Sequence, residues 1–184
     1  MAVSHFWQVH RVLTITSVLF QDMPFKACKV HSSLSDLILK YLALASLVIL
    51  YSLMFIGGYI SAAGLGLTCP EWPLCPNGIM PNDEYFIEWT HRLIAATTGV
   101  LIVATMVGTW INKDANRKIK FTSSLASALV VTQITLGAIV IDTKLHAVLV
   151  SIHLGIGILL FSMVLLTVLF AFRLGKKSIL HTKT

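Results

Sequence analysis

The chain has 184 residues, of which 56% are hydrophobic and 12% are charged, and its formal net charge is +6. This composition is far more apolar than that of an ordinary water-soluble domain. The basic residues gather beside long apolar blocks, so the positive charge is explained without a nucleic-acid partner. The composition therefore excludes a soluble globular class, gives no reason to expect nucleic-acid binding, and favours a membrane protein.

Four apolar blocks are long enough to cross a lipid bilayer, for which a helix needs roughly 20 apolar residues. They lie at about 37–62, 85–111, 121–141 and 146–172. Inside lipid every backbone polar group must be satisfied within the protein, and helices meet that requirement in segments of this length. We therefore expect an all-α membrane protein, with residues 36–173 forming a four-helix transmembrane bundle.

The basic residues also predict how the bundle lies in the cell membrane. They precede the first block, separate the second from the third and follow the fourth, whereas the loop 63–84 contains no lysine or arginine. By the positive-inside rule, both termini are expected in the cytoplasm and the loops 63–84 and 142–145 on the extracytoplasmic side. Residues 1–35 are expected to form a cytoplasmic or interfacial tail, and residues 174–184 a basic cytoplasmic tail.

Two cysteines, Cys69 and Cys75, lie in the proline-containing loop that is predicted to face outward. Because that side of the membrane is oxidising, we expect a disulfide between them. The sequence leaves open whether such a bond is structural or redox-active. Cys28, on the reducing side, is expected to be a free thiol.

Ionisable side chains stand at the outer end of the second block, in Glu88-Trp89-Thr90-His91-Arg92. On a helix Glu88 and His91 share a face, and Arg92 flanks it. Charged groups at membrane depth are expensive and mark functional sites by default. The alternative is an interfacial helix start, in which Glu88 is favoured near the helix N-terminus and Arg92 extends toward the surface.

A second histidine, His153, lies inside the fourth block at nearly the same distance from its outer end as His91 in the second block. With 1.5 Å of rise per residue, both imidazoles should lie roughly 10 Å below the outer surface, on two parallel helices. Bundles build cofactor sites from such facing side chains, and two axial imidazoles in an apolar cavity are typical of haem. Gly155 and Gly157 would leave room for the macrocycle. The alternative is that serine or backbone groups form hydrogen bonds with both imidazole rings.

Small and amide residues predict helix packing elsewhere in the bundle. The glycine-rich run 57–66 permits close approach of a neighbouring helix or of a flat ligand. Gln133, the lone amide of the third block, is expected to hydrogen-bond a neighbouring helix.

Taken together and in this order, these motifs resemble the haem A synthase family. The resemblance covers nearly all of 37–172 and is carried by Cys69-Pro70-Glu71-Trp72-Pro73-Leu74-Cys75, Glu88-Trp89-Thr90-His91-Arg92, Gln133-Ile134-Thr135-Leu136-Gly137 and His153-Leu154. It implies an oxidoreductase that converts haem O to haem A for terminal oxidases by oxidising a methyl group to a formyl group. It further implies that His91 and His153 are axial haem iron ligands, that Glu88 is the catalytic carboxylate, and that Cys69 and Cys75 are the redox or structural pair. Arg92 could pair with a haem propionate.

Family members usually have eight spans in two similar halves, whereas this chain resembles one half. One half provides one histidine pair, which implies one haem site per chain and favours a homo-oligomer, most simply a symmetric dimer. By resemblance the cofactor is haem b, the substrate is haem O, and the other partners would be a haem O synthase or a terminal oxidase. His146 is given no family role.

Two functions of other classes stay open on the sequence. A b-type cytochrome that only passes electrons would use His91 and His153 but would not need Glu88 or the cysteines. A thiol–quinone oxidoreductase would use Cys69 and Cys75 as its active pair, but that class usually has a second outer cysteine pair, which this sequence lacks.

Overall fold

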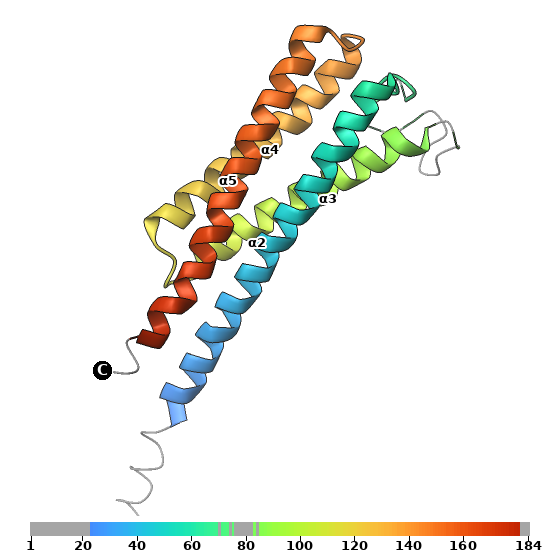
Figure 1. Ribbon diagram of the computed structural model, residues 1–184. Coiled ribbons are helices and arrows are strands. Elements are labelled where there is room, and N and C mark those ends of the chain that lie inside the picture. Colours follow the sequence, from blue (N-terminus) through green and yellow to red (C-terminus); the bar gives the residue numbers. More distant parts are fainter. Residues whose placement is uncertain (1–22, 70, 74, 76–82, 84, 181–184) are drawn as a thin grey trace, which may run out of the picture.

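The computed structural model describes residues 23–180 apart from 70, 74, 76–82 and 84, and helices dominate the part that it describes (Figure 1). The helices are α2 (Met23–Ala63), α3 (Phe86–Ile111), α4 (Arg117–Asp142) and α5 (Ala147–Leu180). No strand occurs among the described residues. The all-α class predicted from composition is confirmed.

Each helix contains a segment that is long and apolar enough to cross a membrane. These segments are Leu34–Ala63, Phe86–Ile111, Arg117–Asp142 and Ala147–Leu174. They agree with the four predicted spans to within a few residues. The helices themselves are longer at the two ends of the chain, because α2 already begins within the expected tail and α5 continues past its span. Residues 1–22 of the expected cytoplasmic or interfacial tail lie outside the described residues.

The helices form a four-membered ring in which each one packs against two others. The contacting pairs are α2 with α3, α3 with α4, α4 with α5, and α5 with α2. Successive helices run in opposite directions, so α3 and α5 run in the same direction (Figure 1). The contacting pairs place α3 and α5 at opposite corners of the ring. The connection between α2 and α3 and the turn between α4 and α5 lie at one end of the bundle, which we call the disulfide end.

The apolar core draws on all four helices. Its buried residues are Leu50, Ile102, Ala126, Val130, Leu160 and Val164. Many large apolar side chains instead point outward, including Phe55, Val100 and Ile158, each at least 60% exposed. An outward-facing apolar surface of this kind is what a helix bundle presents to lipid.

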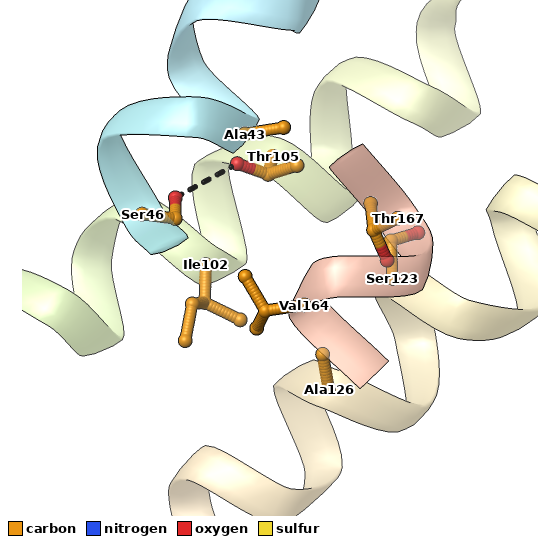
Figure 2. A pocket seen from close by; sticks show the side chains of 8 residues that line it. All are labelled: Ala43, Ser46, Ile102, Thr105, Ser123, Ala126, Val164 and Thr167. Carbon is orange, nitrogen blue, oxygen red and sulfur yellow. Dashed lines mark hydrogen bonds between the residues drawn. The ribbon is translucent and has the colours of Figure 1, made fainter. Parts of the chain in front are cut away.

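Hydroxyl side chains replace apolar ones in the half of the core away from the disulfide end. The hydroxyl of Ser46 lies 3.3 Å from that of Thr105, and the hydroxyl of Thr167 donates to that of Thr122 at 3.0 Å. A cavity of about 10 Å³, comparable with one water molecule, lies among these helices. Figure 2 shows the side chains that line it. The cavity is lined by Ala43, Ser46, Ile102, Thr105, Ser123, Ala126, Val164 and Thr167. Without a hydrophobic driving force between helices in lipid, such polar contacts and small residues fix how the helices pack.

The turn between α4 and α5 packs against the connection between α2 and α3. The backbone N–H of Leu145 donates to the carbonyl of Val140 at 2.8 Å, which ends α4 in a tight turn. The side chain of Leu145 lies against Gly66, where an added Cβ would meet it at 3.1 Å. This contact holds the two connections together at the disulfide end.

Candidate functional site

The predicted disulfide is present in the connection between α2 and α3. Cys69 and Cys75 are joined, with their Cα atoms 5.1 Å apart, and both are buried. The pairing expected from the sequence is therefore confirmed. Whether the bond is structural or redox-active stays open.

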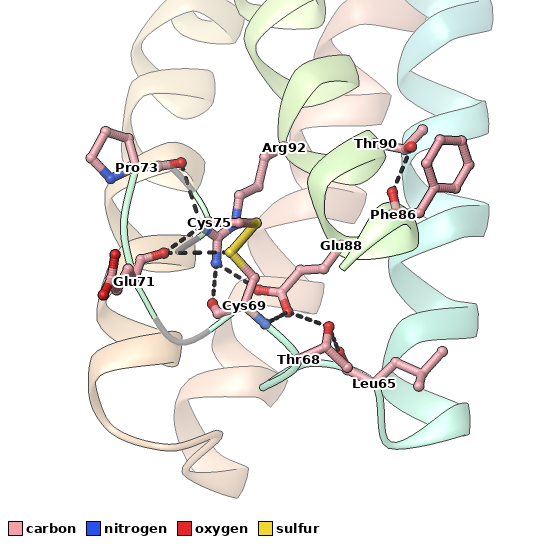
Figure 3. The surroundings of a disulfide bond; sticks show 10 residues. All are labelled: Leu65, Thr68, Cys69, Glu71, Pro73, Cys75, Phe86, Glu88, Thr90 and Arg92. Carbon is pink, nitrogen blue, oxygen red and sulfur yellow. Dashed lines mark hydrogen bonds and ion pairs between the residues drawn. A yellow bond between two sulfur atoms is a disulfide. The ribbon is translucent and has the colours of Figure 1, made fainter. Parts of the chain in front are cut away.

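Glu88 joins the first turn of α3 to the disulfide connection (Figure 3). Only 4% of the residue is exposed, although it lies at the end of the bundle. Its Oε2 accepts hydrogen bonds from the hydroxyl of Thr68 at 3.0 Å and from the backbone N–H of Cys69 at 2.9 Å. Its Oε1 pairs with Arg92 at 2.6 Å. Both carboxylate oxygens are thus engaged by groups that hold the disulfide in place.

Arg92 makes the matching contacts from one turn further along α3 (Figure 3). Its Nη2 donates to the carbonyl of Cys69 at 2.6 Å, and its Nη1 donates to the carbonyls of Glu71 at 2.5 Å and Pro73 at 3.4 Å. Backbone carbonyls that no helix or sheet satisfies are bound here by one guanidinium. In this structure the donors of Arg92 hold the connection, so pairing with a haem propionate stays a prediction.

His91 points in a different direction from its neighbours Glu88 and Arg92. Three residues on a helix correspond to a rotation of about 60° between Glu88 and His91, which is enough to place them against different neighbours. The ring of His91 lies against Gly57 of α2, where an added Cβ would be 3.0 Å from the imidazole Cε1. Any side chain at position 57 would displace this ring. Within the glycine-rich run, Gly57 therefore leaves the space that the imidazole of His91 occupies.

His153 lies on α5, at the corner of the bundle opposite His91 on α3. Its ring packs on Gly137 of α4, where an added Cβ would be 3.7 Å from the imidazole Cε1. Its backbone carbonyl accepts a hydrogen bond from Nε2 of Gln133 at 2.9 Å, which confirms the expected contact of Gln133 with a neighbouring helix. The sequence alone does not identify His153 as the partner of Gln133.

The two histidines are alike in how their ring nitrogens are placed. Nδ1 of each ring is buried without a hydrogen-bond partner, and among the described residues neither histidine forms an ion pair. A buried polar atom left unpaired is unfavourable and calls for an explanation. Two imidazoles free of competing carboxylates on diagonal helices fit a haem with two histidine ligands.

His146 does not join this pair. It precedes the first residue of α5, is exposed, and contributes its backbone carbonyl to the N–H of Val150. The structure therefore brings together Glu88, Arg92 and the disulfide in one cluster and places His91 and His153 in another. Thr68, Gly57 and Gly137 complete these clusters and were not singled out as site residues, because only contacts between distant segments reveal them.

The disulfide yields a direct test. Without reductant, mass spectrometry should find Cys69 and Cys75 linked, while Cys28 reacts with an alkylating reagent and serves as the internal control. Replacing both linked cysteines by serine should lower the free energy of unfolding by about 2 kcal/mol, since a short closed loop is released. Two free thiols at positions 69 and 75 in protein from an oxidising compartment would contradict even a structural role.

Comparison with known proteins gives a consistent result. Residues 81–183 match the family model COX15-CtaA, described as cytochrome oxidase assembly protein. The chain is 31% identical over 142 residues to Heme A synthase of Bacillus licheniformis, covering 76% of this chain and 47% of that protein. It is 28% identical over 138 residues to Heme A synthase of Bacillus pumilus, covering 73% and 45%. The chain thus spans about half the length of these curated relatives.

The chain is also similar to proteins named as Protoheme IX farnesyltransferases. Protoheme IX farnesyltransferase of Halobacterium salinarum is 31% identical over 115 residues, covering 61% of this chain and 26% of that protein. Protoheme IX farnesyltransferase 1 of Natronomonas pharaonis is 31% identical over 118 residues, covering 64% of this chain and 25% of that protein. A segment similar to this chain therefore makes up about a quarter of each of these proteins.

Proposed function

This chain belongs to the haem A synthase family, and from that premise we propose that it converts haem O to haem A by oxidising a methyl group to a formyl group. The observation that carries the proposal is the pair His91 and His153, which lie on diagonal helices with both Nδ1 atoms buried and without a hydrogen-bond partner among the described residues. His91 of α3 and His153 of α5 would hold a haem through its iron. Bound there, haem b would supply one-electron redox chemistry in an apolar site.

The oxidation removes four electrons from a carbon atom, which a one-electron acceptor outside this chain must take up, and it installs one oxygen atom, so protons must also leave the reacting centre. We propose Glu88 as the group that handles these protons, because it is a carboxylate three residues from a ligand and shielded from solvent. Its contacts with Thr68, Cys69 and Arg92 fix its position through three groups. The same contacts give Glu88 a second task, which is to anchor the disulfide connection to α3.

We further propose that the disulfide end faces the extracytoplasmic side of the cell membrane. The opposite end carries Lys113, Arg117, Lys118 and Lys120 in and after the connection between α3 and α4, and Arg173 lies near the same end of α5. The positive-inside rule places such a cluster in the cytoplasm. An oxidising compartment would then surround the Cys69–Cys75 bond, as its formation requires.

The comparisons support proposals about the partners of this chain. Two proteins named for farnesyl transfer to protohaem IX carry a segment similar to this chain. We propose that this chain receives its substrate from a separate enzyme of that kind, since joining two activities in one polypeptide favours transfer between them. Because the chain spans about half of the Heme A synthases that it matches, we also propose that two copies associate as a homodimer, with terminal oxidases receiving the product.

The proposed reaction is tested by extracting haem from cells that make haem O, with and without this protein. Chromatography should show haem A only in cells that also express the protein. If the purified protein shows a b-type haem spectrum but the cells accumulate no haem A, the function is electron transfer by a b-type cytochrome. If it binds no haem and instead oxidises thiols through Cys69 and Cys75, the thiol–quinone alternative is correct.

A further inference from the structure

Helices α4 and α5 are joined by few polar contacts, and one of them involves a proposed haem ligand. Among the described residues, two side-chain hydrogen bonds connect these helices: Gln133 to the carbonyl of His153, and Thr167 to Thr122. The first lies in the half of the bundle nearer the disulfide, and the second lies in the other half. In lipid, where apolar surfaces gain little by meeting, such bonds and close glycine contacts determine how one helix sits against the next.

The contact at His153 depends on a glycine that leaves room for the amide. A Cβ added at Gly157 would lie 2.8 Å from Nε2 of Gln133, closer than real Cβ contacts allow. Gly157 follows His153 by one helical turn, so the amide reaches the His153 carbonyl across the bare backbone of α5. A carbonyl oxygen has two lone pairs and accepts this bond in addition to its helical one.

The imidazole of His153 extends along α4 from this anchored carbonyl. Gln133 and Gly137 are one turn apart on α4, and they contact the carbonyl and the ring of His153, respectively. Side chains on a helix tilt toward its N-terminus, whereas its carbonyls point toward its C-terminus. The ring and the carbonyl of His153 therefore contact two successive turns of α4. The height and the rotation of His153 are thus both set against α4.

We propose that Gln133 is a positioning residue for His153, and that its hydrogen bond to the His153 carbonyl holds the imidazole in the orientation in which it binds haem iron. The inference rests on the proposed function, because it assumes that His153 is a ligand. Gln133 itself does not bind the iron. Its Oε1 is buried without a partner among the described residues, so its Nε2 contact is the one that secures the amide.

Two replacements that each remove one hydrogen bond separate positioning from general stability. Gln133→Leu removes the hydrogen bond to His153, and Thr122→Val removes the hydrogen bond to Thr167 between the same two helices. In haem titrations of the purified full-length protein, Gln133→Leu should weaken haem affinity about tenfold, the lower end of the effect of groups that orient a metal ligand. It should also shift the low-spin electron paramagnetic resonance signal. Thr122→Val should leave both unchanged.

A second matched pair tests the glycine contact. Gly157→Ala should reproduce the effect of Gln133→Leu, because the new methyl group displaces the amide. Gly58→Ala in α2 should have little effect, because a Cβ added there has no neighbour within 4 Å. Both changes put the same residue into a helix, so helix propensity does not distinguish them.

A haem-free measurement completes the test. Diethylpyrocarbonate modifies accessible imidazoles, and mass spectrometry reports His153 and His91 within one molecule. The ratio of the His153 rate to the His91 rate should rise in Gln133→Leu and stay unchanged in Thr122→Val. Wild-type affinity, spectrum and ratio in Gln133→Leu would overturn the positioning role. If His153→Ala also leaves haem binding unchanged, the proposed ligand itself fails, and the two failures are thereby distinguished.

Discussion

Replacing His91 or His153 by alanine should abolish the low-spin haem spectrum of the purified protein. Each substitution removes one of the two imidazoles that lie on diagonal helices, and no second histidine is available on either α3 or α5 to take its place. Loss of one axial ligand converts a low-spin iron to a high-spin one or releases the haem altogether. Optical spectroscopy and haem quantification on the same sample measure both outcomes.

His146→Ala is the matched control for this experiment. His146 is exposed beside the first turn of α5, and its backbone carbonyl accepts from the N–H of Val150. The spectrum of this variant should equal that of the wild type. Unchanged spectra in both His91→Ala and His153→Ala would remove the two-histidine site, and loss of the spectrum in His146→Ala alone would show that the ligand from this part of the chain is misassigned.

Glu88→Gln should leave haem bound but reduce haem A formation by about a hundredfold or more, the size of effect typical of a lost proton-transfer group. The amide has nearly the shape of the carboxylate, and its oxygen can still accept from Thr68 and Cys69. It does not titrate, however, and it carries no charge to pair with Arg92. Haem extraction should therefore show haem O, or an alcohol intermediate, in place of haem A.

Thr68→Val separates proton handling from anchoring of the disulfide connection. This change removes one hydrogen bond to Oε2 of Glu88 while leaving the carboxylate and the ion pair with Arg92 in place. If Glu88 handles protons, Thr68→Val should keep most of the haem A yield. Wild-type yields from Glu88→Gln would exclude the proton-handling role. Equal losses in the two variants would show that the anchor alone matters.

Much of this protein follows from local properties of its sequence. Hydropathy identified the four spans because a helix that crosses lipid needs little more than a long apolar segment. The rise per residue predicts that His91 and His153 lie at one depth, since depth along a helix follows from residue count. The Cys69–Cys75 pair followed from their short separation and the side of the membrane to which their loop was assigned.

Other features were decided only by how the helices pack. The sequence placed Glu88, His91 and Arg92 on neighbouring faces of α3, but the rotation of α3 and the path of the disulfide connection determine which neighbours they meet. Glu88 and Arg92 consequently bind backbone of the connection, whereas His91 packs on Gly57. Helix α2 begins at Met23, ahead of its apolar block. Hydropathy could not predict this start, because polar residues can extend a helix past the membrane.

The contact of Gln133 with His153 shows most clearly which features follow from the sequence and which depend on helix packing. The sequence predicted that a lone amide in a membrane helix would find a partner on another helix, because an unpaired amide in lipid is unfavourable. It could not identify the partner, since that depends on the vertical offset between α4 and α5 and on the missing side chain of Gly157. The sequence by itself thus determined the four membrane-spanning helices and the need for polar contacts between them. It also predicted the depth of the two histidines. The tertiary structure alone decided which side chains meet, because the register between two helices is set by close packing across segments distant in the chain.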